Sequence, residues 1–390
     1  PFFFMKFFFT IFIASLLFFG RPSDSFSIQK NLFLKDSISN FNSDTIKARL
    51  ISLNKKTPID ILHTPELENL IKNYLTNRKK FFNKSSGLIN YYFPIFEKAL
   101  QNNKAPLELK YLPIIESRLD PRAVSKAGAT GLWQFMYAAA KENGLELNSY
   151  IDERMDPEKS SEAAAKYLLK LKESYNDWTL AVAAYNAGPR TISKAIIRSG
   201  GYKNFWNIRG FLPYETAKYV PSFIATMYVL EYANEHGITL YKEEFSKNKT
   251  DTIHVKEQIS FSHIARFLEI PLDTIEFLNP SYIHKIIPKI NNKTQAVTLP
   301  ASYTLLYAAI ENELYDYAEK EFELSEKPLP DLYSINSKII YKIKYGDYLG
   351  SISKKFGVKT GDIMRWNNLS SDKIKENQRL IIFPKRIPKN

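Results

Sequence analysis

Cysteine is absent from all 390 residues of the sequence. Its absence excludes disulfides, thiolate metal sites and cysteine nucleophiles. It also removes the residue at which a lipoprotein is acylated, so we expect no lipid attached in that way. Histidine is scarce, and the five residues are scattered without the spacing of metal ligands. Because the sequence also has no phosphate-binding loop and no nucleophile elbow, we expect neither a metal nor another cofactor.

Long apolar runs are rare, and the exception lies near the start of the sequence. Lys6 precedes an apolar run over residues 7–19, and small and polar residues follow it. This order is typical of a secretory signal peptide, which we predict over residues 1–25. The run is short for a membrane-spanning helix. We therefore expect export to the periplasm or cell envelope, with membrane association through the N-terminus if the leader is not cleaved.

Acidic residues are fewer than basic ones, and the formal net charge of +13 favours an anionic partner. The last 53 residues, 338–390, hold 13 Lys+Arg against 4 Asp+Glu, a balance of +9. Most of the excess therefore belongs to the C-terminal module. Export argues against nucleic acid, which leaves an acidic glycan or a membrane surface.

Helical patterns dominate residues 86–240, and we predict an all-α domain there. Asp156-Pro157 predicts an N-cap and a first-turn proline for a helix through Leu171. Gly188 and Pro189 should end a short apolar helix that begins at Trp178. Residues 26–85 are polar and weakly periodic, so we leave them as a poorly defined segment with one helix near 66–76. A length of 390 residues allows two or three domains.

Residues 338–384 change character and read as strand, helix, helix, strand. A fainter copy lies 88 residues upstream, over 250–302, where apolar positions and Asn279 match the later unit and Asn367. The tight turn Gly346-Asp347 is replaced there by Gln258-Ile259. Two prolines and several polar residues make 325–337 a predicted linker.

Glu116 is the most informative single residue. It follows the apolar stretch 112–115, where poor solvation should raise the pKa of its carboxyl group, as a general acid near neutral pH requires. A glycine-containing run, 125–136, comes next and holds Trp133 and Gln134. Glycines allow close backbone approach, and an aromatic face and an amide suit sugar binding. The combination points to chemistry on a polysaccharide.

The motifs together resemble a known family. Glu116-Ser117, the run Ser125-x-x-Gly128-x-x-Gly131-Leu132-Trp133-Gln134-Phe135-Met136 and Ala184-Tyr185-Asn186-Ala187-Gly188 resemble the soluble lytic transglycosylases, which have a lysozyme-like fold. Leu212-Pro213-Tyr214-Glu215-Thr216-x-x-Tyr219-Val220-Pro221 is similar to the subgroup of membrane-bound murein transglycosylase D type. The unit at 338–384 resembles a LysM domain. The fold class we expect is mainly α, with a lysozyme-like domain, a degenerate LysM-like unit and a small α+β LysM domain.

The resemblance implies cleavage of the MurNAc–GlcNAc bond of peptidoglycan, with formation of a 1,6-anhydro end. Ordinary glycosidases use two carboxylates, but Asp120 precedes a proline and reads as a turn residue. In a transglycosylase the 6-hydroxyl of the sugar attacks, so Glu116 alone can serve as acid and then base. The resemblance further implies substrate-binding positions. They are Ser117, which contacts substrate or orients Glu116, Gln134, Tyr185 near Glu116, Asn186, and Glu215 in a structural or positioning role.

Trp133 and Met136 are expected in the core. In the LysM domain at 338–384, the resemblance implies glycan contacts from two loops that face each other, at Gly346, Asp347, Tyr348, Met364 and Arg365. Trp366 and Asn367 are expected to be structural.

Two alternatives stay open at this point. The chain could be a peptidoglycan-binding protein without activity, although Glu116, Gln134, Tyr185 and Asn186 argue against loss of catalysis. It could also be a hydrolase that uses water, as lysozyme does. Endo or exo action, the preferred peptide stem and the oligomeric state are not readable from the sequence.

Overall fold

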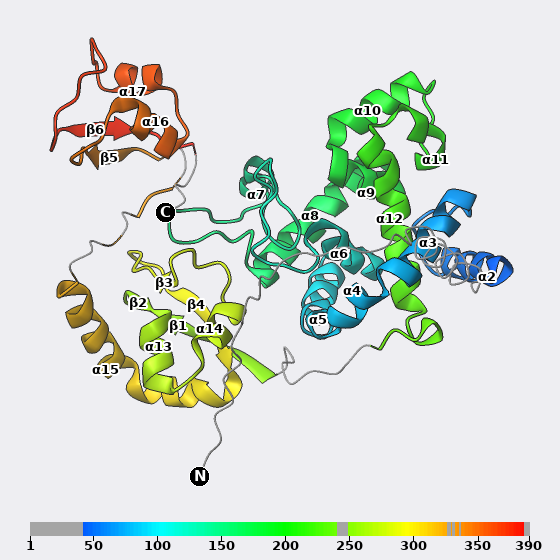
Figure 1. Cartoon of the computed structure of the whole chain (residues 1–390), viewed down its shortest axis with the longest axis horizontal. Helices are drawn as coiled ribbons and strands as arrows, with labels where there is room; N and C mark the ends of the chain where they lie inside the picture. Colours follow the sequence, from blue (N-terminus) through cyan, green and yellow to red (C-terminus); the bar gives the residue numbers. More distant parts are fainter. Residues whose placement is uncertain (1–41, 240–248, 326–328, 330–331, 335–336, 386–390) are drawn as a thin grey trace, which may run out of the picture.

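The structure, a computed structural model, describes residues 42–239, 249–325, 329, 332–334 and 337–385. Figure 1 shows three bodies: a large helical part, a first α+β unit beside it, and a small C-terminal unit. The predicted signal peptide lies outside the described residues. No helix among the described residues is both long enough and apolar enough to span a bilayer.

The large body is built from helices, and between residues 86 and 236 the only β-type pairings are isolated bridges. Its helices are α2 (Ser43–Asn54), α3 (Pro65–Asn77), α4 (Lys79–Lys84), α5 (Ser86–Asn102), α6 (Leu112–Ser117), α7 (Tyr137–Glu142), α8 (Pro157–Tyr175), α9 (Trp178–Ala187), α10 (Pro189–Arg198), α11 (Phe205–Ile208) and α12 (Tyr214–Glu231), with 3-10 turns at Leu107–Tyr111, Arg209–Phe211 and Asn234–His236.

Local signals explain where the main helices begin and end. The Asp156 side chain accepts hydrogen bonds from the first-turn N–H groups of α8, and Pro157 is the first helical residue, as predicted. The helix runs to Tyr175, one turn beyond the predicted end. Gly188, with φ +80°, ends α9, but Pro189 at once begins α10, which the sequence analysis did not predict.

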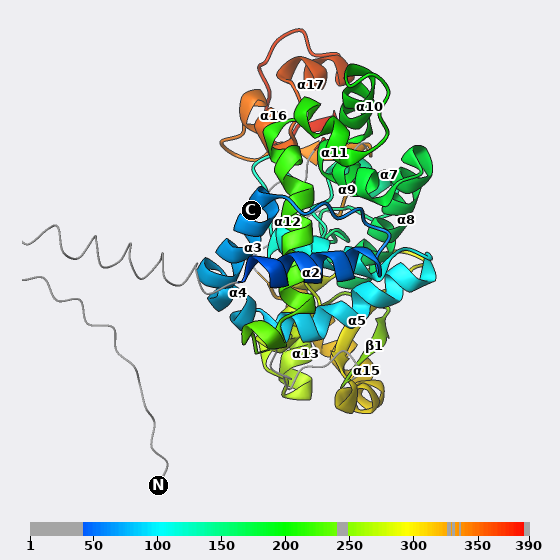
Figure 2. The same cartoon turned by 90° about the vertical axis from the view of Figure 1, so that its right-hand side faces the viewer.

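Helix α12 forms the centre of the helical part. Nearly all of its residues from Tyr219 to Leu230 are buried, and it packs against α3, α6 and α9. In Figure 2 it runs vertically through the molecule, with α2 lying across it. Residues 43–84, which the sequence left poorly defined apart from one helix near 66–76, fold into three helices whose apolar side chains join this core. The predicted helix is confirmed as α3.

The first α+β unit contains β1 (Thr250–Val255), β2 (Ile259–Ser260), α13 (Phe261–Leu268), α14 (Leu272–Leu278), β3 (Ile286–Ile287) and β4 (Gln295–Pro300). Strands β1 and β4 pair antiparallel, with Thr250 opposite Pro300 and Val255 opposite Gln295. A 3-10 turn, Ala301–Tyr303, leads into the 20-residue helix α15 (Thr304–Glu323), which packs on α13. The sequence analysis ended this unit at residue 302 and did not foresee α15.

The C-terminal unit has the predicted order: β5 (Ile339–Lys342), α16 (Leu349–Phe356), α17 (Thr360–Trp366) and β6 (Arg379–Ile382). Strands β5 and β6 pair antiparallel. Gly357, with φ +66°, ends α16 as expected. The cap of α17 is the backbone of Lys359, and Thr360 is already helical, one residue away from the predicted cap.

One asparagine in each unit proves the repeat at atomic detail. The Asn367 amide nitrogen donates to the Ile363 and Ile381 carbonyls, and its oxygen accepts the Ile381 N–H. Asn279, 88 residues earlier, makes the same three bonds to Ile275 and Thr298. Each amide therefore fastens the second helix to the last strand, and Asn367 is structural as expected.

Candidate active site

Glu116 is the penultimate residue of α6, at the centre of the helical part. The helix stops directly after it, because Arg118 and Leu119 adopt left-handed backbone conformations, with φ +57° and +64°. The Tyr219 hydroxyl, from α12, donates a hydrogen bond to Oε1 of Glu116. The sequence analysis did not single out Tyr219, although its fourth motif contains this residue.

Burial gives Glu116 the titration expected of a general acid. It raises the pKa of Glu116 to about 7, and the hydrogen bond from Tyr219 offsets part of the rise because it favours the carboxylate. In the described part of the chain, no other carboxyl group contributes to this shift. Burial and the charge of Glu116 also raise the pKa values of Tyr185 and Tyr219 well above 10. Glu116 therefore lies in a poorly hydrated site beside two phenols that stay neutral.

Asp120, the nearest acid in sequence, has another task. Its side chain is exposed, and Oδ1 accepts the Arg122 N–H at 2.8 Å, so it stabilises a turn as predicted. Glu215 is exposed in the first turn of α12 and makes no hydrogen bond or ion pair with another described residue. No contact of the Glu215 side chain with another described residue therefore supports its predicted structural or positioning role.

The glycine-containing loop after α6 is tightly folded. Gly131, with φ +88°, allows an approach that no other residue would permit: an added Cβ would lie 1.8 Å from the Arg154 carbonyl oxygen. Gln134 also has a positive φ, +50°, although it is not a glycine. Its amide nitrogen donates to the Gly131 carbonyl at 2.9 Å and is 3.2 Å from that of Ala123. The amide nitrogen thus holds the loop, and only the amide oxygen is left for a sugar.

Side chains next to Glu116 fix the same loop through its carbonyl groups. The Ser117 hydroxyl is buried and lies 3.0 Å from both the Pro113 and Leu132 carbonyl oxygens. The Tyr185 hydroxyl donates to the Trp133 carbonyl at 2.7 Å. This arrangement favours the orienting role for Ser117 over a direct substrate contact. Tyr185 lies near Glu116 as expected, but the hydrogen bond to Glu116 comes from Tyr219.

Of the two residues expected in the core, Trp133 is buried and Met136 is not, and Asn186 links two helices. Asn186 accepts a hydrogen bond from the Thr216 hydroxyl at 3.1 Å, which ties the end of α9 to the start of α12. Trp133 is fully buried, and its ring N–H donates to Ser161, so its predicted place in the core is confirmed. The same prediction was wrong for Met136, which is 48% exposed. Met136 precedes α7 with an extended backbone, so its side chain leaves the core that Trp133 enters.

Three of the predicted glycan-binding residues of the C-terminal unit, Gly346, Asp347 and Tyr348, lie on the segment between β5 and α16. The expectation of a second loop was wrong for Met364 and Arg365, which lie in the last turn of α17. Gly346 turns the chain with φ +84°, and the Asp347 carboxylate accepts hydrogen bonds from the Tyr341 hydroxyl and the Lys344 N–H. Asp347 therefore stabilises the turn. Tyr348 is 66% exposed, which leaves its ring open to a ligand. After α17 starts, Met364 packs partly on the core, and Arg365 is exposed and pairs with Asp362 at 2.8 Å.

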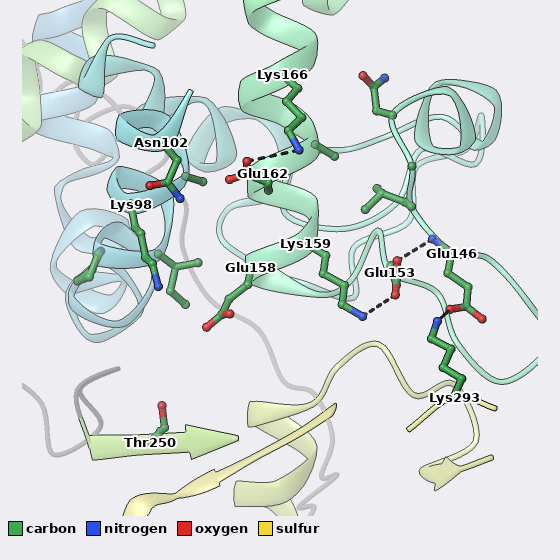
Figure 3. A pocket seen from close by; sticks show the side chains of 17 residues that line it. Lys98, Asn102, Glu146, Glu153, Glu158, Lys159, Glu162, Lys166, Thr250 and Lys293 are labelled. Carbon is green, nitrogen blue, oxygen red and sulfur yellow. Dashed lines mark hydrogen bonds and ion pairs between the residues drawn. The ribbon is translucent and has the colours of Figure 1, made fainter. Parts of the chain in front are cut away.

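A large cavity lies elsewhere, between α5, α8 and the first α+β unit. It encloses about 910 Å³, and Figure 3 shows its charged lining. None of the predicted site residues lines it. Its lysines and glutamates pair with one another across the wall, as Lys159 does with Glu153 at 2.5 Å and Lys166 with Glu162 at 3.5 Å. The cavity is therefore a charged gap between two bodies and not the site that holds Glu116.

The part of the chain that the structure describes holds no group of side chains suited to bind a metal ion. No three side chains of histidine, aspartate or glutamate are grouped there to hold an ion. The chemistry that the site offers is proton transfer by one half-buried carboxyl group, that of Glu116.

Family comparisons agree with this geometry. The model described as "Transglycosylase SLT domain" matches residues 93–207. The model "Lytic transglycosylase MltD, LysM-like domain" matches 249–316, and "LysM domain" matches 341–383. The first match contains Glu116 and the glycine-containing loop. The other two matches fall on the two units that repeat at an offset of 88 residues.

Individual proteins similar to this chain are also named as transglycosylases. Membrane-bound lytic murein transglycosylase D of Escherichia coli K12 is 29% identical over 315 residues, which are 79% of this chain and 67% of that protein. Peptidoglycan transglycosylase gp16 of Escherichia phage T7 is 38% identical over 100 residues, 25% of this chain and 8% of that one. Among solved structures, the 70 kDa soluble lytic transglycosylase of Escherichia coli is 20% identical, with a TM-score of 0.33, over 46% of this chain and 33% of that chain.

Proposed function

We propose that this chain cleaves the β-1,4 bond between MurNAc and GlcNAc in peptidoglycan and leaves a 1,6-anhydro-MurNAc end. It belongs to the lytic transglycosylases with a C-terminal LysM domain. The observation that carries the proposal is the half-buried Glu116, whose pKa is raised to about 7. Near neutral pH a large fraction of this carboxyl group is protonated and can donate its proton.

Two proton transfers complete the reaction. Protonated Glu116 gives its proton to the glycosidic oxygen as the bond to the anomeric carbon breaks, and GlcNAc leaves with that proton. The resulting carboxylate then accepts the proton of the 6-hydroxyl while the oxygen of that group bonds to the anomeric carbon. Protons balance, Glu116 is regenerated, and neither water nor a second carboxylate enters the reaction.

Tyr219 supports both transfers. Its hydroxyl donates to Oε1 of Glu116, so it directs the other carboxyl oxygen to the substrate and stabilises the carboxylate formed halfway through the reaction. Ser117, Gln134 and Tyr185 hold the glycine-containing loop around this group, and Asn186 and Glu215 lie where α9 ends and α12 starts. We assign them substrate positioning on that basis.

The C-terminal unit supplies retention on the polymer. We propose that Tyr348, Met364 and Arg365 contact N-acetylglucosamine units, with Gly346 and Asp347 shaping the turn beside them. The basic charge of residues 338–390 adds long-range attraction to carboxylate-rich peptide stems, and salt should weaken it. The boundaries 86–240, 250–302 and 338–384 are proposed for the catalytic, LysM-like and LysM domains, with residues 43–84 packed into the core of the first and α15 packed on the second.

The cellular place follows from the substrate and from the apolar leader in the sequence. We propose export to the periplasm or cell envelope, with membrane association through the N-terminus if the leader is retained. Fractionation of cells that express the full chain, before and after a high-salt wash, tests both statements. Recovery in the cytoplasm would contradict export.

Mass spectrometry of digested sacculi tests the reaction. Anhydro-ended muropeptides are the expected products. Reducing ends would assign the chain to the hydrolases that use water, and absence of any soluble product would make it a binding protein. Glu116→Gln keeps the shape but cannot supply the proton, so it should abolish release and leave sacculus binding intact. Continued cleavage by this variant would disprove the assignment of the acid.

A further inference from the structure

The first LysM-like unit, residues 250–302, pairs with the catalytic part along residues 150–152, which we call the shared segment. The Asp152 N–H donates to the Ser281 carbonyl at 2.9 Å, and the Ile283 N–H donates to the Tyr150 carbonyl at 2.8 Å. Between these bonds, Ile151 and Tyr282 form an antiparallel bridge. The backbones of the unit and of the catalytic part are therefore hydrogen-bonded to each other like neighbouring strands, which holds the two more closely than a linker does.

The 88-residue repeat shows which face of the unit makes this contact. Because Asn279 and Asn367 make the same three hydrogen bonds, the two units can be aligned without a gap around them. Glu276 and Phe277 then occupy the positions of Met364 and Arg365, two of the proposed glycan-binding residues.

The catalytic part covers these equivalent positions. The Phe277 ring lies 5.0 Å from the ring of Tyr91 and 6.2 Å from that of Tyr92, centroid to centroid. The Glu276 carbonyl accepts a hydrogen bond from the Arg122 guanidinium at 2.6 Å. At the other loop, Ile259 replaces Asp347 and is buried in the core of the unit itself. In the first unit, one part of the face expected to bind sugar is thus packed against the catalytic part, and the other part has lost its polar turn residue.

The shared segment continues into the active site. The Asp152 carboxylate accepts two hydrogen bonds from the Arg154 guanidinium, at 2.9 and 2.7 Å, and the side chains are only 6% and 12% exposed. Arg154 in turn donates to the Gly128 and Phe135 carbonyls, at 3.0 and 3.3 Å. These two carbonyls lie on either side of the Leu132 and Trp133 carbonyls, which Ser117 and Tyr185 hold.

We propose that the first LysM-like unit does not bind glycan but braces the active site, with Arg154 as a positioning residue between Asp152 and the loop. The proposal rests on the proposed function. It extends that function by giving the middle unit a catalytic task and leaving sugar retention to the C-terminal unit. The unit sets the position of Asp152, Asp152 sets that of Arg154, and Arg154 fixes the loop that encloses Glu116.

Kinetics of the full chain with Arg154→Gln and Arg154→Lys test the brace. On soluble peptide-free glycan strands, Arg154→Gln should lower kcat about tenfold to a hundredfold, because small misplacements of a catalytic loop have such effects. KM should change less than about threefold. Arg154→Lys should fall between, since it keeps the charge and loses the fork. The alkaline limb of the pH profile should also move to lower pH, because a loosened loop lets water reach Glu116.

Lys293→Gln is the matched control. It removes an ion pair with Glu146 at the same interface but touches no part of the loop, so its kcat, KM and pH profile should equal those of the wild type. Unchanged kcat in Arg154→Gln would overturn the brace. So would a loss of activity that merely follows the folded fraction, with the pH profile unmoved. Failure of the proposed function looks different, because the wild type itself would then release no anhydro ends.

Sugar binding by each unit can be followed separately. In full-length Glu116→Gln with labelled Ile and Met methyl groups, a pentamer of N-acetylglucosamine should shift the NMR signal of Met364. The signal of Ile283, which is 38% exposed beside the shared segment, should stay in place. A saturable shift of Ile283 that survives Tyr348→Ala would mean that the first unit binds glycan, and it would overturn the proposal.

Discussion

Removal of the Tyr219 hydroxyl is the sharpest test of the proton donor. In the structure this hydroxyl donates to Oε1 of Glu116, and the bond holds the pKa of Glu116 lower than burial alone would set it. A hydrogen bond to a charged group is worth about 1.5–3 kcal/mol, and one pKa unit corresponds to about 1.4 kcal/mol. Tyr219→Phe should therefore raise the pKa of Glu116 from about 7 by about one to two units.

The assay is the release of anhydro ends from soluble glycan strands between pH 5 and pH 9. The acid must be protonated in the free enzyme, so kcat/KM falls as the pH rises through the pKa of Glu116. For Tyr219→Phe, the alkaline limb should lie about one to two units higher than in the wild type, and the maximal rate should drop because the carboxyl group is less well oriented.

Tyr185→Phe provides the control for this experiment. Its hydroxyl donates to the Trp133 carbonyl and not to Glu116, so it should lower the rate without moving the limb upward. An alkaline limb that stays in place or moves downward in Tyr219→Phe would refute the argument that this hydrogen bond sets the pKa.

Three further predictions concern stability and binding. Because the pKa of Glu116 is raised from 4.5 to about 7, the folded protein holds this proton more tightly and its free energy of unfolding falls as pH rises from about 4.5 to 7. Glu116→Gln should thus be more stable than the wild type by up to about 3 kcal/mol at pH 8 and similar at pH 4 in urea titrations; equal pH dependence would contradict it. Gly131→Ala places Cβ 1.8 Å from the Arg154 carbonyl oxygen, whereas Gly128→Ala, at the same φ, meets nothing within 4 Å. The first should lower Tm and activity far more than the second, which carries only about 1–2 kcal/mol of backbone strain, and equal losses would refute the clash. Removal of residues 338–390 should weaken sacculus pull-down and leave cleavage of short soluble glycans nearly unchanged, and undiminished pull-down would count against the LysM assignment.

The sequence predicted best those elements whose ends carry chemical signals. Asp156-Pro157 and Gly188 marked α8 and α9 because an acceptor at the N-cap and a glycine at the end have few other reasons to be there. Helix α15 has no side-chain cap, and it buries only Tyr307, Leu314 and Ala318 in 20 residues. So sparse a stripe gives little helical periodicity to detect.

The active site was predictable in its acid and not in its hydrogen bonds. Glu116 could be found because it stands within the family motifs, and the apolar stretch before it implies a raised pKa, with which the value of about 7 agrees. That Tyr219, and not Tyr185, bonds to Glu116 depends on how α12 packs against α6, a contact between residues 103 positions apart. Likewise, the 88-residue repeat located the first unit, but its docked face is visible only through Phe277 and its aromatic neighbours.

One carboxyl group that serves in turn as acid and base is subject to opposite demands. As an acid, Glu116 gives up its proton more readily when its pKa is low; as a base, its carboxylate takes a proton more readily when its pKa is high. A pKa near the working pH meets both demands, because each form is then close in free energy to the other. Burial raises the pKa, Tyr219 restrains the rise, and the result is about 7. Burial also limits water, which would compete with the 6-hydroxyl for the anomeric carbon. The loop that Arg154 fixes therefore bears on two properties at once: loosening it should lower the pKa of Glu116 and let some products end in a reducing sugar.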